Sequence, residues 1–259
     1  MNELPIIVIT LTVLFLLFGL FKKLSPVSSS TYITDQTIKE LSKKYLKYDL
    51  LQIGLLLFLT LLLTVVFYNL FLWLSDFRVS LFENTIFAVK SYRAGLIIAS
   101  LFTAMLTASM LLVYSGKLIL KNNWAEYLAY NNFKYGFNYE RITTLVIKCF
   151  AVITSILIIL TFDYFTVFRT DNIILNGFFS LGNKTYLYSD IKDISDVQKC
   201  KAPNGNILQD RHFLIEFKDG ETWNSKESGY AVYDKDIKII ELIKAKSGLD
   251  TRILEFEEN

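Results

Sequence analysis

Residues 50–75 read LLQIGLLLFLTLLLTVVFYNLFLWLS, a run without a single charged side chain. A helix needs about 20 predominantly apolar residues to cross the roughly 30 Å hydrocarbon core of a bilayer. The run is longer than that, so it predicts a membrane-spanning helix and indicates that the chain is an integral membrane protein.

Three further apolar stretches lie at residues 4–21, 94–116 and 142–162. The last contains Lys148, which sits within two turns of the start of its span and can reach the interface along its aliphatic stem. Together with a hydrophobic fraction of 53% and a mean hydropathy of +0.37, these stretches exclude a wholly soluble or disordered protein. The sequence predicts a four-helix transmembrane bundle in residues 1–163.

The first stretch resembles either a cleaved signal peptide or a retained anchor. Its leading residues Met1-Asn2-Glu3 contain no basic side chain, and Lys22 and Lys23 follow the apolar run instead of preceding it. No Ala-x-Ala-like cleavage site follows Phe21. We therefore expect a retained signal anchor.

The segment before the second span is rich in lysine. Residues 37–40 fit a capping box, and apolar side chains then recur at helical spacing, which predicts an amphipathic helix lying at the headgroups before it turns into the span. We expect these charges to set the topology without a lipid preference. The alternative is contact with anionic lipid, at about 1 kcal/mol for each lysine, by Lys39, Lys43, Lys44 and Lys47.

Two features of the spans have a structural and a functional interpretation. Small residues recur every four positions in the third span, at Ser100, Ala104 and Ala108, which favours packing within the chain but also fits a homo-oligomer interface. Asp76 and Asp163 close the second and fourth spans. They are interpreted as helix-end residues facing water, with a shared cation or proton site as the alternative.

The chain changes character near residue 164. Residues 1–163 carry a net charge of +5, whereas residues 164–259 carry −3. The second part consists of short β-prone runs separated by turn signals, which predicts strands. The runs are 164–169, 173–179, 185–189, 191–197, 212–217 and 221–225. Lys218-Asp219-Gly220 predicts a hairpin turn between the last two.

Residues 234–247 predict one closing helix. Its apolar face comprises Ile237, Ile239, Ile240, Leu242 and Ile243. Gly248 is placed to end the helix. Strands followed by one amphipathic helix indicate a small α+β domain over residues 164–259, because the helix must bury its apolar face against the sheet.

The stretch from Tyr164 to Ile194, YFTVFRTDNIILNGFFSLGNKTYLYSDIKDI, resembles the opening strands of bacterial pleckstrin-homology-like (PH-like) domains attached to membrane spans. The closing helix fits as well, so the resemblance covers about the last third of the chain. It implies a seven-stranded, strongly bent antiparallel sheet capped by the helix, and binding or assembly rather than catalysis. The net negative charge of this domain argues against a basic pocket for phosphoinositides.

Catalytic, metal and cofactor chemistry have little support in the sequence. The chain has two cysteines, Cys149 in an apolar run and Cys200 in a polar loop, and one histidine, His212. These are too few and too scattered for a zinc site or a disulfide framework. Motifs of hydrolases, metalloproteases and P-loop proteins are absent from the sequence. We expect no enzyme activity, no cofactor and no nucleic-acid partner, and interpret His212 beside Arg211 as a tolerated edge-strand residue instead of a pH sensor.

The sequence favours a membrane-anchored interaction or scaffolding module that holds the PH-like domain at the bilayer surface for a protein partner. The alternative is a small transporter or channel component, since four spans can line a pore in an oligomer. We expect the bacterial plasma (inner) membrane. Lysine and arginine concentrate in the loops 22–49 and 117–141, and by the positive-inside rule this places the C-terminal domain outside the cell. The PH-like resemblance instead suggests the cytoplasm.

Overall fold

The computed structural model of the chain describes residues 19–27, 35–90, 93–177, 182–201, 206–209, 211–228 and 233–256. The chain forms two compact units. One comprises Met1–Thr64 and Leu101–Thr154, and the other comprises Val65–Ser100 and Ser155–Asn259. Three long helices pass from one unit into the other, and the strands all belong to the second unit.

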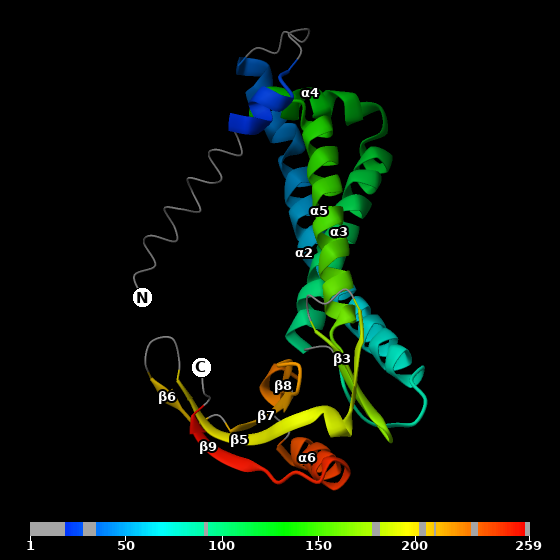
Figure 1. Ribbon diagram of the computed structural model, residues 1–259. Helices are drawn as coiled ribbons and strands as arrows, with labels where there is room; N and C mark the ends of the chain where they lie inside the picture. Colours follow the sequence, from blue (N-terminus) through cyan, green and yellow to red (C-terminus); the bar gives the residue numbers. More distant parts are fainter. Residues whose placement is uncertain are drawn as a thin grey trace. The chain divides into compact units, whose positions relative to one another are not determined.

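The helical part contains α2 (Asp35–Ser80), α3 (Arg93–Leu120), α4 (Trp124–Tyr135) and α5 (Tyr139–Asp163), as Figure 1 shows. Three segments are long and apolar enough to cross a membrane, and they contain the predicted spans at 50–75, 94–116 and 142–162. Membrane association by these three helices is therefore supported. The predicted span at 4–21 lies almost wholly outside the described residues.

The small residues of α3 are buried within the chain. Ala99, Ser100, Ala104 and Ala108 have no exposed surface. In the second unit, Ala99 packs with Leu96 and Phe71. Small side chains let helix backbones approach closely where lipid provides no hydrophobic driving force. The predicted packing within the chain is confirmed.

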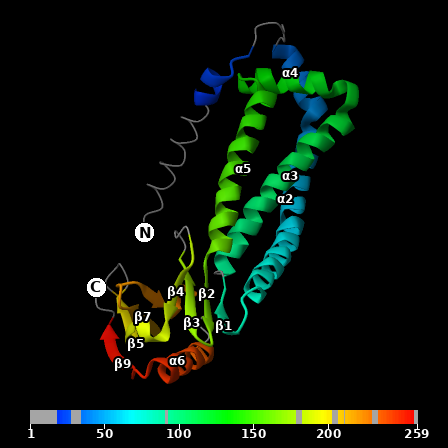
Figure 2. The same cartoon turned by 45° about the vertical axis from the view of Figure 1, so that its right-hand side comes forward.

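The strands form two sheets, visible in Figure 2. The first sheet has the order β1-β2-β3-β4, and the second has the order β6-β5-β7-β8 with β9 added alongside β5. The strands of the first sheet are β1 (Thr85–Val89), β2 (Phe165–Arg169), β3 (Asn172–Asn176) and β4 (Lys184–Leu187). Those of the second are β5 (Ile191–Lys201), β6 (Ile207–Leu208), β7 (His212–Phe217), β8 (Thr222–Asn224) and β9 (Arg252–Phe256). All pairings are antiparallel except that of β9 with β5, which is parallel.

Helix α6 (Tyr233–Ser247) closes the core of the sheet part. Ile239, Ile240 and Ile243 are buried against side chains of both sheets, as the predicted apolar face requires. Gly248 adopts a φ of 73° and its N–H donates to the Lys244 carbonyl at 2.9 Å. The predicted closing helix and its glycine cap are confirmed. A helical N-terminal part followed by a curled, sheet-rich part is thus the observed architecture.

Strand β1 is the main departure from the sequence prediction. It lies between α2 and α3, in a segment predicted to be a loop, and pairs with β2 from Phe87 opposite Phe168 to Val89 opposite Thr166. Val89 is buried in the same core as α6. A five-residue strand gives a weak local signal, and its partner is some 80 residues away. The sheet therefore begins before the chain has completed its membrane part.

Candidate functional site

The four lysines for which lipid contact was the alternative interpretation divide into two groups on α2. Lys39, Lys43 and Lys47 are exposed and follow one another at a spacing of four, which places them along one helix face. Lys44 instead forms an ion pair with Glu126 of α4, with an Nζ–Oε1 distance of 2.7 Å. The structure therefore leaves three of the four lysines aligned on one exposed face.

The apolar face of the same segment packs against α4. Tyr45 is buried, and its ring lies 5.1 Å from that of Tyr127 and 5.9 Å from that of Tyr130. Ile38, Leu41 and Tyr48 pack around the same three rings. We call residues 37–48 together with α4 the collar. The sequence predicted a turn between a surface helix and the second span. This prediction is wrong, because α2 is one continuous helix of 46 residues. In addition, α4 covers the helix face that was expected to meet the headgroups.

A cavity of about 530 Å³ lies beside the collar, within the first unit. Its walls come from α2, α3, α4 and α5 and include both charged and aliphatic side chains. A volume of this size is within the range of roughly 300–1,000 Å³ of small-molecule sites. This makes the cavity a candidate binding site of the helical part.

The polar wall of the cavity is organised around Asp49. The Tyr127 hydroxyl donates to Asp49 Oδ1 at 2.8 Å, and Lys134 Nζ lies 3.9 Å from Asp49 Oδ2. The Lys134 ammonium also lies over the rings of Tyr130 and Tyr135, at 5.3 and 5.2 Å from their centroids. The cavity thus presents one carboxylate and one ammonium side by side, with aromatic rings around them.

The two carboxylates that close the spans have separate basic partners in the second unit. Asp163 Oδ1 accepts from Arg78 at 3.3 Å and from the Asn176 amide at 2.9 Å, whereas Asp76 pairs with Lys90. Arg78 also lies over the Phe165 ring, 4.6 Å from its centroid. The structure does not join Asp76 and Asp163 into a shared cation site. Instead, Asp163 links the ends of two spans to strand β3.

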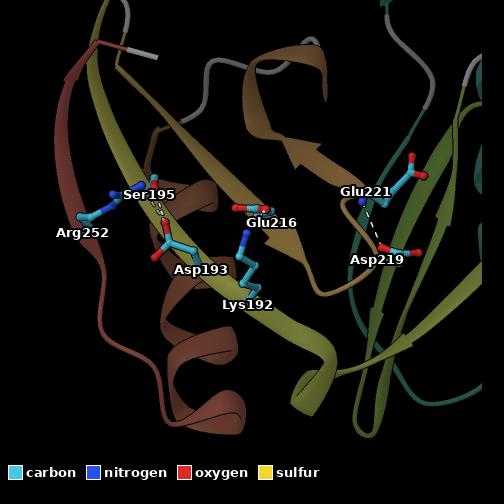
Figure 3. Close-up of polar contacts among 7 residues, drawn as sticks. All are labelled: Lys192, Asp193, Ser195, Glu216, Asp219, Glu221 and Arg252. Carbon is cyan, nitrogen blue, oxygen red and sulfur yellow. Dashed lines mark hydrogen bonds and ion pairs between the residues drawn. The ribbon is translucent and has the colours of Figure 1, made fainter. Parts of the chain in front are cut away.

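The charged side chains on the second sheet bind one another, as Figure 3 shows. Lys192 Nζ lies 2.5 Å from Glu216 Oε1, which ties β5 to β7. Asp193 accepts from the Ser195 hydroxyl at 2.8 Å and lies 3.2 Å from the Arg252 guanidinium, which ties β9 to β5. These contacts stabilise strand pairing.

The predicted turn at Asp219 is stabilised by its own carboxylate. Gly220 adopts the positive φ, 87°, that the prediction requires, and Asp219 Oδ1 accepts the Glu221 N–H at 3.0 Å. That backbone hydrogen bond, together with one from the Tyr186 hydroxyl, lowers the pKa of Asp219 below its ordinary value. The carboxylate therefore acts here as a turn-forming acceptor.

The expectation that His212 is an edge-strand residue is wrong. It is buried on β7, which lies between β5 and β8, and it faces Val197 in the register. Its neighbour Arg211 binds Asp196, with Nε 2.8 Å from Oδ1. The guanidinium of Arg211 is therefore held by a carboxylate of β5.

Comparisons with known proteins add no relative. No protein-family model matches the chain, and neither curated proteins nor solved structures yield a match. Among the described residues, no group of three or more His, Cys, Asp or Glu side chains is arranged to hold a metal ion. The geometry of the molecule alone must therefore indicate its function.

The residues around the cavity escaped the sequence prediction. Asp49 and Tyr127 are 78 positions apart, so no local spacing predicts their contact. One signal was present, because Asp49 is the last charged residue before the apolar run of the second span. A carboxylate at the start of a span requires a partner, and Tyr127, in the segment that follows the third span, supplies one.

Proposed function

We propose that the protein is a membrane-anchored interaction module, in which four spans hold a PH-like domain at the bilayer surface for a protein partner. The observation that supports this is the way the sheet is attached. Strand β1, between two spans, pairs with β2, which follows directly on α5. Two separate chain segments thus lead from the spans into one sheet, whereas a tethered domain needs only one linker.

The ion-paired joint between spans and sheet supports the same function. Arg78 on α2 contacts Asp163 at the end of α5, and Asp163 contacts Asn176 on β3. A joint of this kind restricts the orientation of the sheet relative to the helix ends that carry it. Restricted orientation suits a scaffold, because a presented surface binds with less entropy loss when it is already ordered.

Strand β9 is the surface that we propose for the partner. Within the described part of the chain, β9 pairs with one strand, β5, and so forms an edge of the second sheet. Ile253 on this strand is 73% exposed. An extended segment of a partner can add to such an edge by main-chain hydrogen bonds, with side chains such as Ile253 giving specificity.

Photo-cross-linking in living cells tests this proposal. A photoreactive amino acid at Ile253 should yield a discrete adduct with one protein, and the same group at Lys238, exposed on α6, should not. An equal pattern from both positions would contradict the proposed surface. Solute flux through vesicles containing the purified protein, with no adduct from either position, would replace the module by a small transporter or channel component.

The side of the membrane forms part of the proposal. The collar lies in the two lysine-rich loops, so the positive-inside rule places it in the cytoplasm and the sheet part outside the cell. Thiol labelling tests this with Cys149 and Cys200 replaced by serine. A membrane-impermeant reagent should label Ile253→Cys in intact cells, and Lys47→Cys only after permeabilisation. The reverse pattern would place the sheet in the cytoplasm.

Anionic-lipid contact by the exposed lysine face completes the proposal. Replacing Lys39, Lys43 and Lys47 by glutamine should weaken retention of anionic lipid, because each charge contributes about 1 kcal/mol near a charged leaflet. Lys44→Gln is the matched control, since Lys44 is paired with Glu126. Equal lipid retention in the triple variant and the control would leave these lysines as topology signals.

A further inference from the structure

The cavity beside the collar divides into a charged end and an aliphatic end. The charged end has Asp49 and Lys134, with the Tyr127 hydroxyl on the carboxylate. The aliphatic end is formed by Ile53, Leu56, Leu112, Val113, Val146 and Ile147. A ligand that fills both ends must itself be amphiphilic.

The aliphatic end is formed by residues of the three candidate membrane spans, and two of these residues are partly exposed. Ile53 and Val146 follow the first residues of the apolar runs in α2 and α5. Both line the cavity, yet 57% of Ile53 and 45% of Val146 remain exposed. Since lipid surrounds a membrane span, a lipid chain can enter between these side chains without crossing water.

The charged end carries no net charge. Lys134 Nζ is 3.9 Å from Asp49 Oδ2, beyond hydrogen-bond distance, so the ammonium and that carboxylate oxygen are close but not bonded. A headgroup with a single negative charge would approach Lys134 at the cost of repulsion by Asp49. A headgroup bearing both a phosphate and an ammonium can satisfy both side chains, and its ammonium can also lie against the tyrosine rings.

We propose that this cavity binds one zwitterionic phospholipid from the bilayer, with its phosphate on Lys134 and its ammonium on Asp49. One acyl chain lies along the aliphatic end between α2 and α5. This site belongs wholly to the helical unit, and it is independent of the partner surface proposed on the sheet. It differs from the exposed lysine face, which attracts anionic lipid without enclosing it.

Native mass spectrometry of the full-length protein in a mild detergent tests the proposal. Phosphatidylethanolamine, phosphatidylglycerol and water-soluble glycerophosphoethanolamine are added separately. We expect one bound phosphatidylethanolamine per chain, held at least tenfold more tightly than phosphatidylglycerol, and no detectable binding of the soluble headgroup. Equal binding of the two lipids would overturn the headgroup assignment. Binding of the soluble headgroup as tight as that of the lipid would overturn the role of the aliphatic end.

Two variants on neighbouring residues of α3 locate the site. Ser109 lines the cavity, whereas Met110 is exposed and does not. Ser109→Phe should fill the cavity and lower the affinity for phosphatidylethanolamine at least tenfold, and Met110→Phe should leave it unchanged. Equal loss in both variants, or in neither, would contradict binding in this cavity.

Two charge variants test the headgroup assignment without relying on the folding of the Ser109→Phe protein. Asp49→Asn should abolish the preference for phosphatidylethanolamine over phosphatidylglycerol, because the site would then carry a net positive charge. Lys134→Gln should weaken binding of both lipids. An unchanged headgroup preference in Asp49→Asn would contradict the proposal.

Discussion

The spanning helices and the sheet part place their apolar side chains in opposite ways. Leu61, in the middle of the apolar run of α2, is 70% exposed, whereas Phe168, Ile194 and Ile215 in the sheets have no exposed surface at all. Burial of apolar surface is favourable only where water is the alternative. The contrast is the one that hydrocarbon around the apolar helices and water around the sheets would produce.

The first prediction concerns the core of the sheet part and has the largest expected effect. Ile240 is 4% exposed on α6, so Ile240→Asp buries a carboxylate without a partner, which costs several kcal/mol. We expect the sheet part of the full-length protein to lose its resistance to limited proteolysis. Ile253→Asp, on the exposed side of β9, is the matched control and should stay resistant. A resistant Ile240→Asp protein would contradict the assigned core.

The second prediction compares two residues of similar exposure, one in a membrane span and one on the sheet part. Leu61 is 70% exposed and Ile253 is 73% exposed. An aspartate in the middle of a membrane helix costs about 2.5–3.5 kcal/mol of insertion free energy, whereas an exposed site in water changes stability by less than about 0.5 kcal/mol. Leu61→Asp should therefore reduce the membrane-inserted fraction, and Ile253→Asp should not. Identical insertion of the two variants would remove the two-solvent interpretation.

The third prediction concerns the strand that joins the two halves. Val89 of β1 is buried in the core of the sheet part, whereas Ile86 of the same strand is 42% exposed. Val89→Ala should lower the free energy of unfolding by about 2 kcal/mol, because it removes buried methyl groups and leaves a cavity. Ile86→Ala should cost clearly less. Thermal unfolding of the two purified proteins in the same detergent distinguishes them, and equal losses would place β1 outside the core.

The fourth prediction is the smallest and depends on pH. Burial raises the pKa of Tyr188 to about 12, and its hydroxyl donates to the Arg169 carbonyl at 2.7 Å. The folded state holds this proton more tightly than the unfolded chain, whose tyrosine pKa is about 10. Its contribution to stability is therefore fully present below about pH 10 and is lost as the pH rises through 12.

Tyr188→Phe tests this assignment in the sheet part. The variant should cost about 1 kcal/mol at neutral pH, because it removes one hydrogen bond. It should also lose less stability than the wild type when unfolding is measured between pH 10 and 12. An identical alkaline loss in the two proteins would show that Tyr188 does not titrate with folding.

The sequence predicted those parts of the fold that have a strong local pattern. The apolar runs predicted the three spans within α2, α3 and α5. The spacing of Ile237, Ile240 and Ile243 predicted α6 and its buried face. Lys218-Asp219-Gly220 gave the hairpin turn, because glycine alone adopts its positive φ without strain. Each of these signals is contained within a few turns of helix or one tight turn.

The sequence did not predict contacts between distant segments. Strand β1 has five residues, β9 follows the helix expected to end the domain, and each becomes a strand only beside its partner. The collar was misread for a related reason. The face of Ile38, Leu41 and Tyr45 is amphipathic whether lipid or another helix covers it, and only α4 decides between the two.

Hydrogen–deuterium exchange of the full-length protein in lipid nanodiscs tests the central claim, that the sheet is built onto the spans through β1. The amides of Thr85–Val89 that face β2 should exchange far more slowly than those of an unstructured loop, since β1 is the edge strand of the ladder that also contains Phe165–Arg169. Exchange of Thr85–Val89 at the rate of an unstructured loop, with Phe165–Arg169 still protected, would contradict the claim and leave the sheet tethered by α5 alone.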